Sequence, residues 1–400
     1  MKFALVLIGV LLLIIIWLVL DFRLGRKKHL SQVKNLESPM LHGQLDIFPH
    51  GPELFADYFK EIKAAKQHVH ILFYIVKNDA FSLEFLQLLK EKAREGVEVR
   101  LLLDRIGGIY LKKSSINELR EAGVHFSYSN RVKLPYLFYS AQVRNHRKIT
   151  IIDGKIGYLG GYNIGREYIN EDPKLSPWRD YHLKLLGEGA TFLQSEFLID
   201  WRENTNENLL DRSNYFPDVP KGLIRHQFMP TEAVTLEGKY VRLIQMASES
   251  MIIGTPYFIP SKLLFHELIG ALRRGVQLTI LVPYTSDHIL VQEASHHYLR
   301  VLIREGAKVF QFKNGFYHAK TIVIDDKLCD IGTANFDKRS LFLNKEINCY
   351  IYNPEFIGRL KSVLQKDMDD SRPLTLADLT KPNLFRSIKE GIAGIFSYFL

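Results

Sequence analysis

Apolar residues occur along this chain in one long run and a series of short ones. The long run covers residues 3–20, eighteen consecutive apolar residues without a charge, and a helix of this length just spans a bilayer. A cleaved secretory signal is the alternative, but only Lys2 precedes the run and no small-x-small cleavage site follows it. We therefore expect residues 1–20 to form an uncleaved transmembrane anchor.

A basic, polar connector over residues 21–45 follows the expected anchor. It begins with four cations close to the span, against Lys2 alone before it: Arg23, Arg26, Lys27 and Lys28. By the positive-inside bias, this asymmetry predicts that the large C-terminal portion lies in the cytoplasm.

Beyond the connector, short apolar runs alternate with helical patterns in an order that occurs twice. In the first copy, runs at 68–76 and 97–104 flank a segment with helical spacing that ends at Gly96, which predicts a strand, helix, strand crossover. Strands are then predicted at 124–129, 148–153, 155–161 and 181–187, and a helix at 191–204. This order predicts a sheet with both faces covered.

The second copy retraces this order from residue 251. A strand at 251–260 and a helix closing at Gly275 precede predicted strands at 276–283, 308–312, 320–325, 327–333 and 346–352. Four hundred residues exceed the usual size of one core, and a polar stretch broken by proline separates the copies. We expect four parts after the connector: a first half over 46–210, a linker over 211–237, a second half over 238–372 and a tail over 373–400.

The tail ends in a pattern typical of an amphipathic helix. Its apolar residues recur at steps of three and four, at Leu384, Ile388, Ile392, Ile395 and Phe399. Two environments fit this helix: the membrane interface, which is reasonable beside an anchored domain, and the protein's own core.

Composition narrows the choice of partner. With 46% apolar and 24% charged residues the chain is that of a folded protein, and its net charge of +9 favours an anionic partner. Nucleic acid and an acidic membrane surface both fit this charge, but the anchor favours the membrane, and we see no nucleic-acid reader motif. Cys329 and Cys349 are too few for a disulfide framework, and no Cys/His cluster has zinc spacing, so we expect no metal.

The two copies share a polar motif, HxKxxxxD. It consists of residues that are 172 positions apart in the two copies: His146, Lys148 and Asp153, then His318, Lys320 and Asp325. A glycine and an asparagine follow at the same offset, Gly160 with Asn163 and Gly332 with Asn335. One such motif would be a weak signal, but its duplication together with the flanking apolar runs is a strong one.

The motif begins a predicted strand, so its His and Lys, two positions apart, project from one face and its Asp from the other. If the copies meet, one imidazole can attack phosphorus while the other protonates the leaving alkoxide, and the intermediate is a phosphohistidine. We expect Lys148, Lys320, Asn163 and Asn335 to bind the phosphate oxygens, without a divalent cation or other cofactor. A purely structural role for the repeat is the weaker alternative, because a core would have apolar residues there.

A neutral nucleophilic imidazole needs a partner for its other ring nitrogen, and a carboxylate is the usual one. Asp180 and Glu346 begin matching strands, 34 and 28 residues after the histidine of their own half, and we assign them this orienting role. Asp153 and Asp325 belong to the candidate catalytic motif but face away from His and Lys. We expect them to hold the strand end, and their replacement to harm chiefly folding.

These motifs resemble those of the phospholipase D superfamily, and the surrounding segments are similar to bacterial cardiolipin synthases over nearly the whole chain. The more subfamily-specific segments are TPYFIP, GTANFDKRS and LNKEIN. The resemblance implies a duplicated phospholipase D-like α/β fold, with two mixed β-sheet halves flanked by helices around one shared active site. It also implies that a phosphatidyl group passes from one phosphatidylglycerol to another at the bacterial cell membrane, giving cardiolipin and glycerol. His146 is then the nucleophile and His318 the acid, or the reverse.

The chain departs from many cardiolipin synthases in having one predicted span instead of two, and in having Asp326 where a glycine often follows the second motif. These departures concern the choice of donor and acceptor lipid more than the chemistry. Two alternative functions remain: a phospholipase D-type hydrolase or nuclease, and a catalytically silent membrane scaffold. Anionic membrane lipids are expected partners and nucleic acid is not; the oligomeric state is left open.

The segment before the first motif, residues 130–148, mixes basic residues with Tyr136, Phe138 and Tyr139. We expect it to line the entry of the lipid, with Arg131 and Lys133 contacting anionic headgroups.

Overall fold

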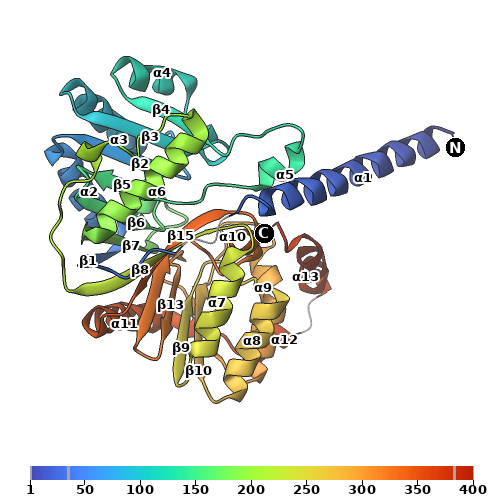
Figure 1. Cartoon of the computed structure of the whole chain (residues 1–400). Helices are drawn as coiled ribbons and strands as arrows, with labels where there is room; N and C mark the ends of the chain where they lie inside the picture. The colour runs from blue at the N-terminus through green and yellow to red at the C-terminus, as the bar shows by residue number, and fades with distance from the viewer. Residues whose placement is uncertain (1, 34–36, 382–383, 400) are drawn as a thin grey trace.

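The structure, a computed structural model, describes residues 2–33, 37–381 and 384–399. Helix α1 (Lys2–Leu30) projects from a body of two α/β halves (Figure 1). By length and composition α1 is a candidate membrane span, and no residue of its apolar stretch is buried. The helix continues to Leu30, beyond the expected end of the anchor at residue 20.

The C-terminal end of α1 is attached to the body at the short helix α5 (Leu137–Gln142). The Asp21 carboxylate accepts a hydrogen bond from the Tyr139 backbone N–H at 2.7 Å. His29 bonds to the Tyr139 hydroxyl and to the Glu232 carboxylate, each at 2.7 Å. These contacts hold the body directly beside the end of the span.

Within the described residues, one sheet of 16 strands runs through both halves. Outward from its centre, the first half contributes β1 (Leu41–His50), β7 (Trp178–Gly187), β6 (Ile156–Gly160), β5 (Ile149–Ile152), β2 (His68–Phe73), β3 (Glu98–Asp104) and β4 (His125–Ser129). In the same order, the second half contributes β8 (Ile224–Glu232), β15 (Lys345–Ile351), β14 (Leu328–Gly332), β13 (Thr321–Ile324), β9 (Ser250–Gly254), β10 (Gln277–Pro283) and β11 (Lys308–Phe312), with β16 (Ser371–Pro373) at the edge. Strands β1 and β8 pair antiparallel, so equivalent strands lie on either side of a pseudo-twofold axis.

The expected strand, helix, strand crossovers are present in both halves. Helix α3 (Ala80–Arg94) connects the parallel strands β2 and β3, and α8 (Lys262–Arg273) connects β9 and β10. Asp79 and Ser261 cap the first turns of these helices. Gly96 and Gly275 follow their last turns with φ of 89° and 93°, a left-handed conformation that glycine adopts without strain.

Helices cover both faces of the sheet. Helices α2 (Gly51–Ala64), α3 and α4 (Lys113–Glu121) bury one core in the first half, and α7 (Thr235–Met246), α8 and α9 (Val291–Arg304) bury one in the second. A third core lies under α6 (Glu188–Thr205) and α11 (Pro354–Asp369) and contains strand residues of both halves, such as Leu183 and Ile331. The remaining helices are α10 (Lys338–Phe342), α12 (Leu376–Thr380) and α13 (Leu384–Phe396). Because the halves share the third core, we infer that they fold as one unit.

The sheet includes two strands that the expected boundaries leave out. Strand β1 begins at Leu41, inside the expected connector, and β8 lies within the expected linker over 211–237. The apolar pattern of β8 is weak because this strand has Pro230 and polar residues, such as His226 and Thr231, that are buried where the halves meet. A second half that begins at residue 238 would therefore lack its central strand.

Asp153 and Asp325 have the same structural role in the two halves. Each ends a motif strand with a positive φ, 50° and 48°, and its carboxylate accepts hydrogen bonds from three consecutive backbone N–H groups. The donors are Lys66, Gln67 and His68 for Asp153, and Ser248, Glu249 and Ser250 for Asp325. The two carboxylates thus tie the motif strands β5 and β13 to the starts of β2 and β9.

We predict that Asp325→Asn lowers the free energy of unfolding by about 1–3 kcal/mol, because a charged acceptor of three partly buried backbone N–H groups is lost. Burial opposes ionisation, but the hydrogen bonds from Ser250, Ser248 and Glu249 lower the pKa of Asp325 to about 2. The contribution is therefore present above the ordinary pKa of 3.8 and is lost as the pH falls towards 2. Thermal unfolding of both proteins from neutral to acidic pH measures this difference.

Asp326→Asn is the matched control, because the neighbouring Asp326 is 60% exposed and pairs only with Lys361 at the surface. Equal melting temperatures for the two variants would contradict the assigned role of Asp325.

Candidate active site

Both motif histidines open into one cavity of about 600 Å³ between the two halves. The expected phosphate-binding asparagines, Asn163 and Asn335, line the same cavity. Its wall also contains aromatic and charged residues: Tyr74, Arg144, Tyr168, Trp178, Tyr257, Asp287, Arg339 and Phe399.

Each histidine segment is held by a strand of the other half. The backbone N–H of His146 donates to the carbonyl of Lys345 on β15 at 2.9 Å. The backbone N–H of His318 donates to the carbonyl of Arg179 on β7 at 2.7 Å, next to the short strand β12 (Phe316–Tyr317), which pairs with β7. The two imidazoles therefore reach the cavity only when the halves are assembled.

The orienting carboxylates also cross between the halves. Both carboxylate oxygens of Glu346 lie 3.0 Å from Nδ1 of His146, and one oxygen of Asp180 lies 2.6 Å from Nδ1 of His318. The two residues expected to orient the histidines lie beside them, but each serves the histidine of the opposite half. The expected pairing within each half is wrong, because each carboxylate begins the strand that holds the other half's histidine.

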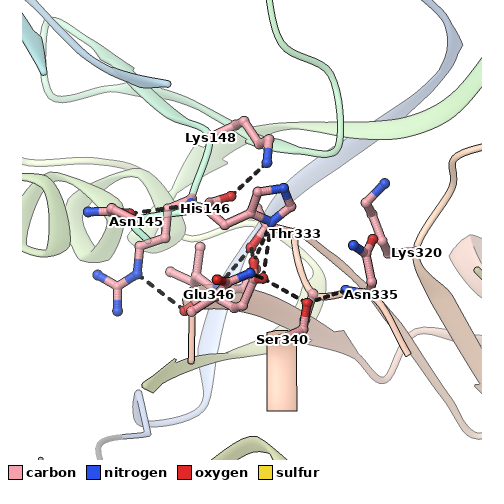
Figure 2. Close-up of polar contacts among 12 residues, drawn as sticks. Asn145, His146, Lys148, Lys320, Thr333, Asn335, Ser340 and Glu346 are labelled. Carbon is pink, nitrogen blue, oxygen red and sulfur yellow. Dashed lines mark hydrogen bonds and ion pairs between the residues drawn. The ribbon is translucent and has the colours of Figure 1, made fainter. Parts of the chain in front are cut away.

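Glu346 lies in a network of hydroxyl and amide donors. Its carboxylate accepts hydrogen bonds from Thr333 Oγ1 at 2.6 Å, Ser340 Oγ at 2.9 Å and Asn344 Nδ2 at 3.1 Å (Figure 2). Full burial opposes ionisation, but the His146 imidazole, the charge of Lys148 and the Thr333 hydroxyl lower the pKa of Glu346. An ionised Glu346 holds the proton of His146 on Nδ1, so that Nε2 carries the lone pair.

Both histidines are neutral at neutral pH in the substrate-free site. Burial and the neighbouring Lys148 lower the pKa of His146 in spite of Glu346. Burial and Lys320 lower the pKa of His318 to about 4 in spite of Asp180. A neutral imidazole with a carboxylate on Nδ1 is the form that can attack phosphorus.

Lys148 and Lys320 are buried next to the histidines, and their ammonium groups lie on the side of the His146 ring away from Glu346 (Figure 2). Lys148 Nζ donates to the His146 carbonyl at 2.7 Å; Lys320 Nζ donates to the His318 carbonyl and lies 3.4 Å from Asp180. Burial, together with repulsion from Lys320, lowers the pKa of Lys148 to about 7. A phosphate oxygen between the two lysines would relieve this repulsion.

The two asparagines are positioned differently. Asn163 Oδ1 accepts from the Ile75 backbone N–H at 3.1 Å, and its amide donates to the Tyr168 hydroxyl at 3.2 Å. Asn335 Oδ1 is buried and has no hydrogen-bond partner among the described residues.

Aromatic residues that line the cavity beside the histidines were not predicted from the sequence. The Tyr74 ring lies 5.0 Å from the His146 ring, and the Trp178 and Tyr257 rings lie 4.8 and 6.1 Å from the His318 ring. Tyr257 belongs to the quoted segment TPYFIP, but only the fold shows that residues following β2 and β9 flank the histidines. Across the described residues, the structure groups no three His, Cys, Asp or Glu side chains able to hold a metal ion.

The expected lipid-entry segment is divided between two cavities. Arg131, Lys133 and Tyr136 line a separate cavity of about 500 Å³ beside the end of α1, whereas Arg144 and His146 line the catalytic one. Phe138 packs between Phe22 and Phe399, with ring centroids 6.1 and 5.9 Å away.

Helix α13 has one side packed on the protein and one exposed side, so it docks on the body, and insertion of the exposed side into the membrane interface stays a prediction. Ala393 is buried, and the helix packs on α9, whereas the outer side exposes Phe385, Ile388, Ile392 and Phe396. The side chains of Leu384 and Ile395 lie outside the described part of the chain. The helix leads to Phe399, which lines the catalytic cavity and contacts Phe22 at the end of the span, 5.6 Å between ring centroids.

Two α/β halves of this topology around one active-site cavity define a phospholipase D-like enzyme. A crystal structure of phosphatidylserine synthase from Haemophilus influenzae has the same fold, with a TM-score of 0.72, 14% identity, and coverage of 94% of this chain and 99% of that one. The model of the family described as "Cardiolipin synthase, PLD-like domain" matches residues 58–173 and 240–368.

Two relatives from Bacillus subtilis strain 168 show which family of this superfamily the chain resembles. The minor cardiolipin synthase ClsB is 39% identical over 400 residues, 100% of both chains. The major cardiolipin synthase ClsA is 37% identical over 359 residues, 88% of this chain and 74% of that one. The chain belongs to the bacterial cardiolipin synthase family and is a membrane-associated phosphatidyltransferase of the phospholipase D superfamily.

We predict that Glu346→Gln and Asp180→Asn each lower kcat by about 100-fold or more, because the neutral amide does not stabilise an imidazolium. Because each carboxylate contacts the histidine of the other half, each substitution should affect the reactivity of that histidine alone. Glu346→Gln slows modification of His146 by diethyl pyrocarbonate and leaves His318 unchanged, and Asp180→Asn has the opposite effect. Peptide mass spectrometry measures both rates, and slowing of the histidine in the same half would contradict the crossed pairing.

We also predict that kcat/KM declines as the pH rises through about 7, because Lys148 is charged below its pKa and loses its charge above it. Lys148→Arg keeps its charge throughout, so this less active variant should show a shallower decline, due only to loss of the histidine proton. A wild-type profile that stays level into the alkaline range would contradict the role of the Lys148 charge.

Proposed function

We propose that this chain transfers the phosphatidyl group of one phosphatidylglycerol to the hydroxyl of a second, forming cardiolipin and releasing glycerol through a phosphohistidine. The observation that carries the proposal is the pair of crossed histidine–carboxylate contacts, which hold two imidazoles at one cavity. Two imidazoles are the number that a double displacement requires, one as nucleophile and one as acid and base.

In the first step, Nε2 of one histidine attacks phosphorus, and the bond from phosphorus to the glycerol oxygen breaks. The other histidine, protonated, gives its proton to that oxygen, and glycerol leaves. The resemblance to the family assigns the attack to His146 and the proton transfer to His318. Binding of the phosphodiester anion favours the protonated imidazole, which is otherwise scarce because burial and Lys320 lower the pKa of His318.

In the second step, the hydroxyl of the acceptor lipid attacks phosphorus, the bond to the histidine nitrogen breaks, and the hydroxyl proton passes to the second histidine. Both imidazoles return to their starting states. Lys148, Lys320, Asn163 and Asn335 would bind the non-bridging oxygens and stabilise the charge that builds up in each transition state.

The attachment of the body to the anchor supports a membrane route for both lipids. Phe399 lines the cavity and packs on Phe22, close to the basic residues that follow the span. By the positive-inside bias, those cations keep the catalytic body on the cytoplasmic side. Lipids of that leaflet would reach the cavity beside the end of α1.

The purified full-length protein in phosphatidylglycerol vesicles, without cytidine nucleotide or added metal, should form cardiolipin and glycerol in equal amounts. His146→Ala and His318→Ala should each abolish both products. His266→Ala is the control and should retain activity, because this histidine is exposed on α8 and bonds only within its own helix.

Each other outcome identifies a different function. Phosphatidic acid in place of cardiolipin would mean a hydrolase, in which water takes the acceptor's place. No product from any lipid, with the wild type folded, would favour the scaffold alternative. Cardiolipin formation by both alanine variants would contradict the histidine mechanism.

A further inference from the structure

The duplication is not symmetric at a position shortly after each motif. Asn163 and Asn335 occupy equivalent positions in the two halves. Four residues after them, the first half has Glu167 and the second half has Arg339. Arg339 lines the catalytic cavity, whereas Glu167 is buried away from it and pairs with Lys77 at 3.5 Å. The reacting groups are therefore duplicated, but the charge of the wall is not.

Arg339 is held through neutral groups, although the carboxylate of Asp337 in the same cavity wall also acts on its charge through space. Its guanidinium donates three hydrogen bonds to neutral oxygens: the Gln142 carbonyl at 3.0 Å, Gln142 Oε1 at 3.3 Å and the Phe399 carbonyl at 3.2 Å. Among the described residues no carboxylate forms an ion pair with it. A guanidinium has five N–H groups, so two remain for a ligand.

The other arginine of the cavity differs in this respect. Arg144 is 2% exposed and pairs with Asp104 at 3.1 Å, so its charge is balanced within the protein. Of the two arginines that line the cavity, Arg339 is therefore the one available to bind an anion.

Arg339 lies on the His146 side of the cavity. Burial raises the pKa of the Tyr74 hydroxyl, and the nearby charges of Arg339 and Arg144 oppose that rise. The Tyr74 ring in turn contacts the His146 ring. On the His318 side the charged wall residue is an anion, Asp287, which accepts a hydrogen bond from the Tyr257 hydroxyl at 2.7 Å. The wall also contains Asp337, whose carboxylate interacts electrostatically with Glu346 and Arg339, so the His146 side carries charges of both signs and the His318 side the anion Asp287.

The proposed reaction brings two phosphates to this cavity, and only one of them reacts. The two lysines and two asparagines are occupied by the reacting phosphate. The acceptor phosphatidylglycerol carries its own phosphate, three carbons from the hydroxyl that attacks. This second anion needs a cation that the catalytic groups do not supply.

We propose, on the basis of the proposed function, that Arg339 binds the non-reacting phosphate of the acceptor lipid and so selects phosphate-bearing alcohols as acceptors. The acceptor hydroxyl then forms its bond to phosphorus as the bond to the histidine nitrogen breaks, and its proton passes to the second imidazole. Arg339 takes no part in these bond changes. Water and simple alcohols, which lack the phosphate, gain nothing from Arg339.

The test is a competition between two acceptors in full-length protein. Phosphatidylglycerol vesicles are supplied with ethanol, and cardiolipin and phosphatidylethanol are measured together, because both arise from the same donor. Arg339→Gln should lower the ratio of cardiolipin to phosphatidylethanol by about tenfold or more, as expected for a lost charged hydrogen bond. Arg339→Lys keeps a charge without the fork of donors and should give an intermediate ratio.

Gln142→Ala is the matched control. It removes one neutral acceptor of Arg339 but keeps the charge in the cavity, and its product ratio should equal that of the wild type. A structural effect of Arg339 on the chain end would instead lower both products together in Arg339→Gln.

An unchanged ratio in Arg339→Gln, or an equal loss of both products, would overturn the acceptor site. If Arg339→Gln fails to fold, a wild-type ratio in Arg339→Lys at saturating and at limiting phosphatidylglycerol would overturn it. Wild-type protein that forms phosphatidylethanol but no cardiolipin would instead overturn the proposed function.

Discussion

The catalytic arrangement depends on contacts that cross from one half of the chain to the other. Each histidine takes its backbone support and its carboxylate partner from the opposite half: Glu346 for His146 and Asp180 for His318. Neither half alone contains an oriented imidazole. The paired central strands β1 and β8 and the shared core therefore have a catalytic consequence, since they set the positions of both pairs.

The same arrangement concentrates buried charge. Two lysines and two carboxylates lie at the histidines with little exposure, and burying such groups is unfavourable unless they are paired. Asp180 and Glu346 partly compensate the lysines, but the pKa of Lys148 remains lowered to about 7 because burial and Lys320 disfavour its charge. An anionic phosphodiester supplies the missing negative charge. The site is therefore arranged for a substrate anion, and this fits an enzyme that binds two anionic lipids in turn.

Much of the fold follows from the repeated apolar pattern, because strands such as β2 and β13 are buried on both faces and have continuous apolar runs. The motif residues could be predicted because they occur in both copies. The structural role of Asp153 and Asp325 could be predicted because they lie on the strand face opposite His and Lys. The crossed carboxylate pairing could not be predicted, because sequence separation places Asp180 nearer His146, and only the pairing of β12 with β7 brings it to His318. Strand β8 was missed because Pro230 and the buried polar residues His226 and Thr231 interrupt its apolar pattern, and β1 because it begins in the polar segment after the span. Neither Tyr74 nor Arg339 belongs to a recognisable sequence motif. Tyr74 follows the end of β2 and Arg339 lies at the start of α10, and these positions place both residues in the cavity wall.

The central claim is that one of two imidazoles forms a covalent bond to phosphorus while the other moves the proton. Mass spectrometry after rapid mixing with phosphatidylglycerol and quenching in alkaline denaturant, under which phosphohistidine survives, tests it most directly. A phosphatidyl adduct should appear on His146 or His318 and be absent when that histidine is replaced by alanine. Steady formation of cardiolipin without an adduct on either histidine would contradict it and would mean direct transfer between the two lipids.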